Sequence, residues 1–201
     1  MITTNVYASI RDIKKYALDH KVPIMVDEGI DFLTTFIIKN QIHTVLEIGS
    51  AIGYSAIMMA LSHPNLKITT IEKDETRYLE ALRNIKKLDL EDRITLLFKD
   101  ALEVSIEEKV DLVFIDAAKG QNIRFFEKFS NNLNERGFII TDNMNFHGLV
   151  GKEEEIKSRN LRGLVRKIRE YKEYLEKQSN YKVEFLAIGD GIAIAEKKGH
   201  N

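Results

Sequence analysis

The sequence contains no cysteine, and this absence excludes several classes of function at once. Without cysteine there is no disulfide framework, no thiolate metal site and no cysteine nucleophile. No apolar run approaches the length of a membrane span, and the N-terminus lacks the basic segment and apolar stretch of a secretory signal. We therefore expect a cytoplasmic protein with no membrane partner.

An excess of charge is also missing. The 30 basic and 31 acidic residues leave a formal net charge of −1, so the chain as a whole does not attract nucleic acid. An RNA partner would need a local basic patch. A length of 201 residues and a hydrophobic content of 44% fit one globular domain spanning 1–201. Within it, we expect residues 1–40 to form N-terminal helices that act as a lid or a dimer contact.

Apolar runs alternate with amphipathic helical patterns along most of the chain. Five runs that predict strands alternate in this way, and they cover residues 45–48, 67–72, 93–98, 110–116 and 137–143. Strand and helix in alternation are typical of a Rossmann-like, doubly wound α/β sheet. Two more strands, 181–188 and 192–195, are joined by a tight Gly-Asp-Gly turn and must be antiparallel. The sequence predicts an α/β fold with a seven-stranded sheet that ends in an antiparallel hairpin.

The stretch from Val45 to Ser55 reads as a strand, a tight glycine loop and a helix start. Its spacing is G-x-x-x-G, through Gly49 and Gly53, and the missing G-x-G-x-x-G argues against a nicotinamide or flavin enzyme. The helix that opens near Ser55 offers unpaired N–H groups to a carboxylate, and Glu47 at the strand end can bind an amine. A plain packing turn is the alternative explanation.

A second acid extends this site. Glu72 ends the next predicted strand, 19 residues after Gly53 (72 − 53), where a carboxylate commonly holds a ribose diol. An amino-acid group and a ribose together indicate S-adenosyl-L-methionine.

Three oxygen-bearing side chains follow the two central strands. Asp116 ends one strand, and Asp142 and Asn143 end the next, so the three can meet at the carboxyl edge of the sheet. Two carboxylates and an amide form an oxygen-only set suited to Mg²⁺, and the absence of histidine and cysteine from it argues against zinc. Acids that merely cap the following loops are the alternative.

These motifs resemble the small metal-dependent O-methyltransferases of the catechol and caffeoyl-CoA type, which have the class I S-adenosylmethionine methyltransferase fold. The matching residues are Glu47-Ile-Gly-x-x-x-Gly-Tyr-Ser55, Ile71-Glu72, Asp116-x-x-Lys119 and Asp142-Asn143. The resemblance implies that Lys119 removes the proton of a metal-bound hydroxyl. A solvated surface lysine is the alternative.

The resemblance also implies further cofactor contacts. Met25 would close over the cofactor, Asp100 and the following Ala101 would receive the adenine, and Asp116 would contact the cofactor as well as the metal. Core packing of Met25 and helix capping by Asp100 are equally physical explanations.

A local basic segment follows the metal residues. Residues 151–177 hold nine Lys/Arg and six Asp/Glu, a local charge of +3 (9 − 6), on a predicted helix that extends to about Lys177. Its arginine stripe predicts possible RNA contacts at Arg159, Arg162, Arg166 and Arg169. A solvated helix face is the alternative. His147, in the loop after the metal residues, could hydrogen-bond the acceptor, and a solvated loop histidine is the alternative there.

A closer resemblance is to the bacterial tRNA 5-hydroxyuridine methyltransferases. It is carried by Val22-Pro-Ile-Met25, Ile115-Asp-Ala-Ala-Lys-Gly-Gln121 and Gly189-Asp-Gly-Ile192, together with the glycine loop. It implies conversion of wobble 5-hydroxyuridine to 5-methoxyuridine, with the tRNA anticodon loop as partner and a homodimer as the working form. A small-molecule enzyme acting on catechols or phenolic acyl-CoA, and a non-catalytic nucleotide- or RNA-binding protein, remain alternatives.

Overall fold

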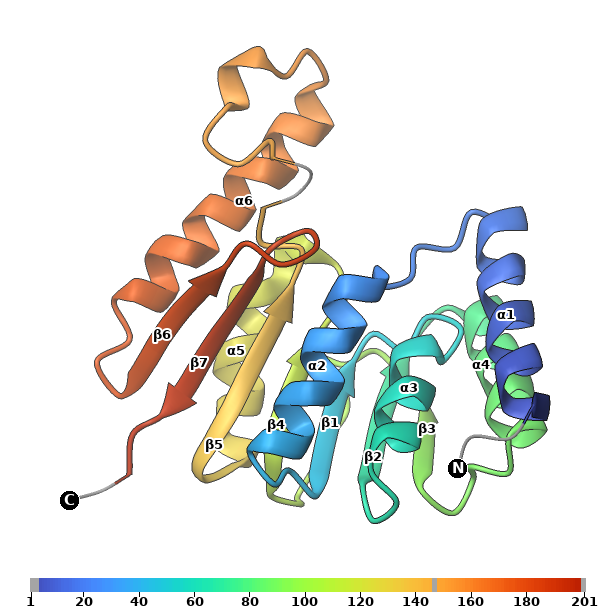
Figure 1. Ribbon diagram of the computed structural model, residues 1–201. Helices are drawn as coiled ribbons and strands as arrows, with labels where there is room; N and C mark the ends of the chain where they lie inside the picture. Colours follow the sequence, from blue (N-terminus) through green and yellow to red (C-terminus); the bar gives the residue numbers. More distant parts are fainter. Residues whose placement is uncertain (1–3, 146–147, 200–201) are drawn as a thin grey trace. The chain divides into compact units, whose positions relative to one another are not determined.

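The computed structural model describes residues 4–145 and 148–199, and the chain divides into two compact units. One unit ends at Val104 and the other begins at Ser105. Each unit has its own group of neighbouring strands, with helices packed against them (Figure 1). The expectation of one domain over residues 1–201 stays a prediction.

The first unit is a parallel three-stranded sheet with four helices. Its elements are α1 (Thr4–Asp19), α2 (Asp27–Lys39), β1 (Thr44–Ile48), α3 (Tyr54–Ser62), β2 (Lys67–Glu72), α4 (Glu75–Lys87) and β3 (Ile94–Phe98). The strand order is β3-β2-β1, and all pairs are parallel. Four of the five residues of β1 are buried, as expected for a strand with both faces covered.

The second unit carries the remaining four strands. Its elements are β4 (Val110–Ile115), η1 (Lys119–Gln121), α5 (Asn122–Phe129), η2 (Ser130–Asn132), β5 (Leu133–Asp142), η3 (Glu153–Glu155), α6 (Arg159–Glu176), β6 (Tyr181–Leu186) and β7 (Ile192–Lys197). The order is β4-β5-β7-β6, with β4 and β5 parallel and β7 antiparallel to both of its neighbours. The predicted α/β class, the seven strands and the antiparallel C-terminal hairpin are confirmed.

Two predicted boundaries are wrong. The phenylalanine-rich segment between the fourth and fifth predicted strands predicts a helix from about Asn122 to Leu133. The helix ends at Phe129, and Ser130 and the two asparagines that follow form a 3₁₀ turn. Asn132 there donates its side-chain amide to the carbonyl oxygens of Ile106 and Glu108. These bonds hold Asn132 against the segment before β4, and β5 begins at Leu133, four residues earlier than predicted.

The start of α2 also differs from expectation. The sequence predicts a helix over about residues 28–40 with Asp27 as its cap. Val26 occupies the cap position instead and makes no side-chain cap bond. The Asp27 carboxylate instead accepts a hydrogen bond from Lys14 Nζ at 2.5 Å and lies 3.4 Å from the Tyr54 hydroxyl. Its role is to join α1 and α3 to the start of α2.

None of the helices that the structure describes is both long enough and apolar enough to cross a membrane. The longest, α6, has 18 residues, and its first half extends past the ends of β6 and β7 (Figure 1).

The turn between β6 and β7 contains a glycine whose replacement by any other residue would destabilise the fold. Gly191 has a φ of +87°, and a Cβ there would lie 2.7 Å from Asn145 N. Gly148 has a φ of +75°, but no described neighbour lies within 4 Å of its would-be Cβ.

We predict that Gly148→Ala lowers the free energy of unfolding by about 1–2 kcal/mol, which is the cost of the left-handed backbone conformation alone.

Gly191→Ala should cost at least about twice as much, because the clash with Asn145 adds to the same backbone cost. Urea unfolding of both variants, followed by circular dichroism, measures the difference. Equal losses for the two variants would show that the turn shifts freely away from Asn145.

Candidate functional site

The glycine loop of the first unit connects β1 to α3 by a sharp reversal. Gly49 and Gly53 have φ values of +98° and +81°, and Gly53 occupies the cap position of α3. The Gly49 and Ser50 amides both donate to the carbonyl oxygen of Ile71, at 3.0 and 3.1 Å. A Cβ on Gly53 would lie 3.3 Å from that of Ala81, so the second glycine serves both the turn and close helix packing.

The Glu47 carboxylate is fully buried at the end of β1. One oxygen accepts a hydrogen bond from Thr70 Oγ1 at 2.5 Å, and the other accepts one from Ser55 Oγ. These hydroxyls fix the carboxylate at the carboxyl end of the strand, where the sequence predicts an amine-binding group. Thr70 was not identified from the sequence, although its register opposite Glu47 in the parallel pair gives the reason for the contact.

Glu72 folds back onto the glycine loop. Its Oε2 accepts a hydrogen bond from Ala51 N at 2.8 Å, and its Oε1 accepts bonds from Lys73 N at 2.9 Å and Asp74 N at 2.8 Å. A carboxylate has about four acceptor positions, so one remains for a ligand hydroxyl. The placement is compatible with the predicted ribose contact.

Asp100 follows β3 and closes the turn after it. Its Oδ1 accepts a hydrogen bond from Leu102 N at 2.9 Å, and its Oδ2 pairs with Lys73 Nζ at 3.2 Å. Residues 99–109 contain no helix, so Asp100 caps a turn and not a helix, and the adenine contact of Asp100 and the buried Ala101 stays a prediction.

Met25 is 4% exposed and lies two residues before the start of α2. Its Cε is 2.8 Å from where a Cβ on Gly29 would stand, so the thioether fills the space that this glycine leaves. The contact supports core packing, and a role for Met25 in covering a cofactor stays a prediction.

The first unit fits S-adenosylmethionine by the chemistry of its donors and acceptors. The buried carboxylate of Glu47 suits an amine, Glu72 retains an acceptor position for a hydroxyl, and the amides at the start of α3 suit a carboxylate. The Ser50 hydroxyl in the loop is buried and has no partner in the part of the chain that the structure describes.

The second unit brings the predicted metal residues together. Ile115 pairs with Thr141 in the parallel register of β4 and β5, so Asp116 and Asp142 leave neighbouring strands side by side. Asn143 follows with a φ of +62°, and its Nδ2 donates to Asp142 Oδ2 at 2.5 Å. Lys119 Nζ contacts Asp116 Oδ1 at 2.6 Å, and both side chains are largely buried.

The electrostatics of this cluster favour an added positive charge. Burial, with further contributions from the negative charges of Asp116 and Asp190, raises the pKa of Asp142 to about 7, while Lys119 and Asn143 act in the opposite direction. A divalent cation would relieve the repulsion between these carboxylates.

Two acids and an amide therefore fit Mg²⁺ as a hard oxygen donor set. In residues 4–145 and 148–199, no three His, Cys, Asp or Glu side chains lie close enough together to bind one metal ion. A metal ion at this cluster would therefore need the amide of Asn143 as a ligand beside the two carboxylates.

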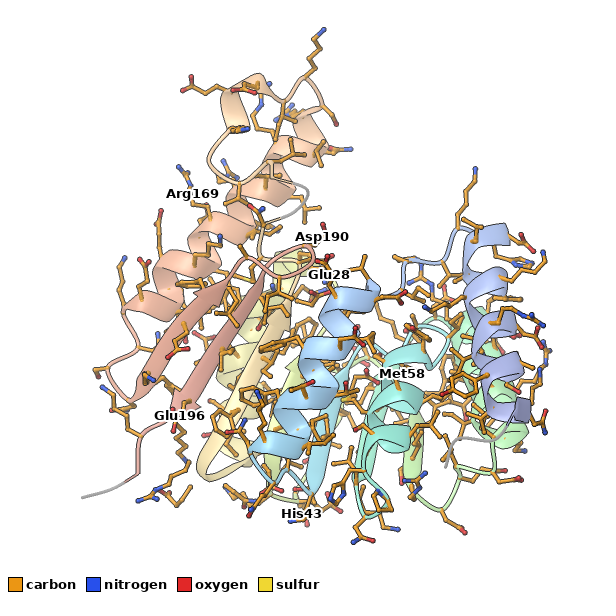
Figure 2. All side chains as sticks on the ribbon, in the orientation of Figure 1. Glu28, His43, Met58, Arg169, Asp190 and Glu196 are labelled. Carbon is orange, nitrogen blue, oxygen red and sulfur yellow. The ribbon has the colours of Figure 1, made fainter. Side chains whose placement is uncertain are left out.

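Sequence reasoning missed Asp190, which lies in the turn between β6 and β7 (Figure 2). The Asn145 amide donates to the Asp190 carbonyl at 2.7 Å, and the Met144 amide donates to that of Gly191 at 2.8 Å. These bonds hold the turn against the segment just after Asp142. The signal in the sequence was the Gly-Asp-Gly motif, which we interpreted only as a turn.

The four arginines of α6 differ in what they contact. Arg162 donates from Nε and Nη2 to the carbonyl oxygen of Ile156, at 3.1 and 2.7 Å, and so fixes the segment before the helix. Arg166 pairs with Glu170 at 3.4 Å, and Arg169 with Glu173 at 3.9 Å. Arg159 is exposed. His147 lies outside the described residues.

The contribution of the Thr70 hydroxyl to stability can be measured with the adjacent Thr69 of the same strand as a control. We predict that Thr70→Val lowers the free energy of unfolding by about 1–3 kcal/mol, because one oxygen of the buried Glu47 carboxylate loses its donor. The half-buried Thr69 gives a matched control, and Thr69→Val should change stability by no more than about 0.5 kcal/mol. Urea unfolding of both variants measures the difference, and equal effects would contradict the assigned contact.

The whole chain resembles known proteins. A family model described as O-methyltransferase matches residues 4–198. The crystal structure of "a putative caffeoyl-CoA O-methyltransferase from Staphylococcus aureus" is 37% identical, with a TM-score of 0.90, over 94% of this chain and 92% of that chain.

Two further relatives agree. An O-methyltransferase from Bacillus cereus, solved in complex with SAH, is 25% identical with a TM-score of 0.80, covering 95% of this chain and 91% of that chain. A caffeoyl-CoA O-methyltransferase of Populus kitakamiensis is 28% identical over 193 residues, covering 92% of this chain and 82% of the relative. The caffeoyl-CoA type of family that the motifs indicated is confirmed, whereas the closer likeness to tRNA-modifying enzymes stays a prediction. Because the family model spans nearly every residue, the chain belongs to the O-methyltransferase family.

Proposed function

We propose that this protein transfers the methyl group of S-adenosylmethionine to a hydroxyl that is held beside a divalent metal ion. The observation that carries the proposal is the cluster of Asp116, Lys119, Asp142 and Asn143 after β4 and β5, which joins a base to an oxygen-only ligand set. The cofactor is supported by the donors and acceptors of the glycine loop and by the relative solved with SAH.

The chain's own residues account for the proton and for the metal. Asp116, Asp142 and Asn143 would hold Mg²⁺, which when bound would stabilise the acceptor oxyanion. Lys119, once deprotonated, accepts the hydroxyl proton at Nζ. S-adenosylmethionine, when bound, would supply the methyl group: its carbon–sulfur bond would break as the methyl carbon bonds to the acceptor oxygen, with S-adenosylhomocysteine as the second product.

The acceptor that we propose first is a catechol-like phenol, either free or as an acyl-CoA thioester. It is supported by relatives described as caffeoyl-CoA O-methyltransferases, and a phenol with two adjacent oxygens could bind a metal through both.

The second candidate acceptor is 5-hydroxyuridine at the wobble position of tRNA. It is favoured by the exposed cations of α6, which could contact phosphates of the anticodon stem and loop. A tRNA acceptor would also imply a cytoplasmic location, and we propose a homodimer as the working form. Tyr7 and Leu18 of α1, whose side chains are 64% and 79% exposed, offer an apolar surface for the dimer contact.

Lys119 is the residue whose replacement tests the reaction. We predict that Lys119→Met lowers kcat by a factor of about 10²–10⁴, the usual contribution of a general base, while the protein still binds S-adenosylmethionine. Lys119→Arg is the matched control, because arginine keeps the positive charge beside Asp116 but does not deprotonate. An active arginine variant would show that Lys119 supplies only charge.

The acceptor and the metal can be tested in one experiment. Labelled methyl transfer would be measured from S-adenosylmethionine to caffeoyl-CoA, to catechol and to tRNA bearing 5-hydroxyuridine, each with and without EDTA. We expect transfer to the caffeoyl thioester or the catechol that EDTA abolishes and Mg²⁺ restores. Transfer to tRNA alone, with 5-methoxyuridine found by nucleoside mass spectrometry, would replace the phenolic acceptor with the tRNA one.

A further inference from the structure

Gly163 lies in the interior of α6, where glycine weakens a helix relative to alanine. A Cβ on Gly53, Gly137 or Gly191 would crowd neighbouring atoms, and Gly148 and Gly151, which have open space there, adopt a positive φ that favours glycine. At Gly163, apart from the two chain neighbours and the backbone of its own helix, no atom of the described residues lies within 4 Å of the would-be Cβ. Packing within the chain therefore does not explain this glycine, whereas close approach of a ligand to the backbone would.

Three basic side chains lie on the same face of α6 as Gly163. Arg159 stands four residues before Gly163, Arg166 three residues after it and Lys167 four residues after it, so all three share its face. Arg159 and Lys167 are exposed, and neither makes an ion pair with any side chain that the structure describes. Arg166 pairs only with the exposed Glu170 at 3.4 Å, a contact that a stronger anion would displace.

Lys167 links this face to the proposed base. Its chain lies over η1, with Cδ 3.2 Å and Nζ 3.3 Å from where a Cβ on Gly120 would stand, and Gly120 directly follows Lys119. Four residues of α-helix rise about 6 Å, so Gly163 and Lys167 are separated by little more than one turn. An anion bound at Gly163 would lie close to the turn that carries Lys119.

We infer that Gly163, Arg159, Arg166 and Lys167 form a binding site for a phosphate group of the acceptor, and hence that the acceptor contains a nucleotide. The inference rests on the proposed methyl transfer. Guanidinium groups bind phosphate through paired hydrogen bonds, an ammonium adds a point charge, and a bare glycine lets the phosphate reach the helix surface. A coenzyme A thioester and an RNA both supply such a phosphate, but a free catechol does not.

Two of the predicted arginine contacts are left out of this site. Arg162 is committed to the carbonyl oxygen of Ile156. Arg169 is six residues beyond Gly163, pairs with Glu173 and lies further along the helix (Figure 2). The site is thus a specific face of α6 and not its whole basic surface.

The test uses Gly163→Ala and Lys167→Gln in the full chain, with Lys177→Gln as a control that removes the same charge from the far end of α6. Binding of coenzyme A and of a short oligouridylate RNA is measured by isothermal titration at low salt. We expect Gly163→Ala to raise the melting temperature and yet to weaken binding of one probe by about tenfold or more, as does Lys167→Gln. Lys177→Gln should bind like the unmodified protein.

The two probes identify the source of the phosphate. Weaker binding of coenzyme A alone assigns the site to an acyl-CoA acceptor, and weaker binding of the RNA alone assigns it to a nucleic acid. If neither probe binds more weakly to Gly163→Ala and Lys167→Gln than to the control, the inference is overturned. Metal-dependent methyl transfer to free catechol, measured in the same variants, reports separately on the proposed function and should survive both substitutions.

Discussion

A carboxylate taken out of water needs hydrogen-bond donors or an opposite charge, and this constraint shapes both units of the protein. Glu47 is fully buried, and Glu72 and Asp142 are 7% and 4% exposed. Each lies at the end of a strand, where the chain turns and backbone amides are free to donate. The loops after these strands take the form that supplies the donors: the amide of Ala51 turns toward Glu72, and the amide side chain of Asn143 turns back to Asp142.

The two units stabilise their buried carboxylates in different ways, and this difference determines which ligand each set of carboxylates can bind. In the first unit, the acids are satisfied by neutral donors, which are hydroxyls for Glu47 and backbone amides for Glu72. Such carboxylates are rigid and suited to binding a ligand by hydrogen bonds. In the second unit, Asp116 and Asp142 adjoin each other, and the rise in the pKa of Asp142 reflects burial and that repulsion. A site of this kind gains most from a divalent cation.

The basic helix shows how a stretch of like charges is divided by its surroundings. The Arg162 guanidinium donates hydrogen bonds to a main-chain carbonyl oxygen, whereas Arg166 and Arg169 form ion pairs with glutamates one helical turn away. Arg159 and Lys167 stay exposed, on either side of a glycine whose would-be Cβ meets no other segment of the described chain within 4 Å. Net charge alone would treat these groups as equivalent, but their capacity to bind an anion differs because of their partners.

The sequence by itself determined the order of strands and helices, the antiparallel hairpin and the acids at the strand ends. Periodicity and glycine spacing act over a few residues, and the carboxyl ends of neighbouring parallel strands must share an edge. What only the tertiary structure decided is which partner each side chain takes. Thr70 meets Glu47 through strand register, Arg162 turns to Ile156, and Asp190 reaches the segment after Asp142 through the hairpin. These contacts join residues that are distant in sequence or have several possible partners, and packing selects among them.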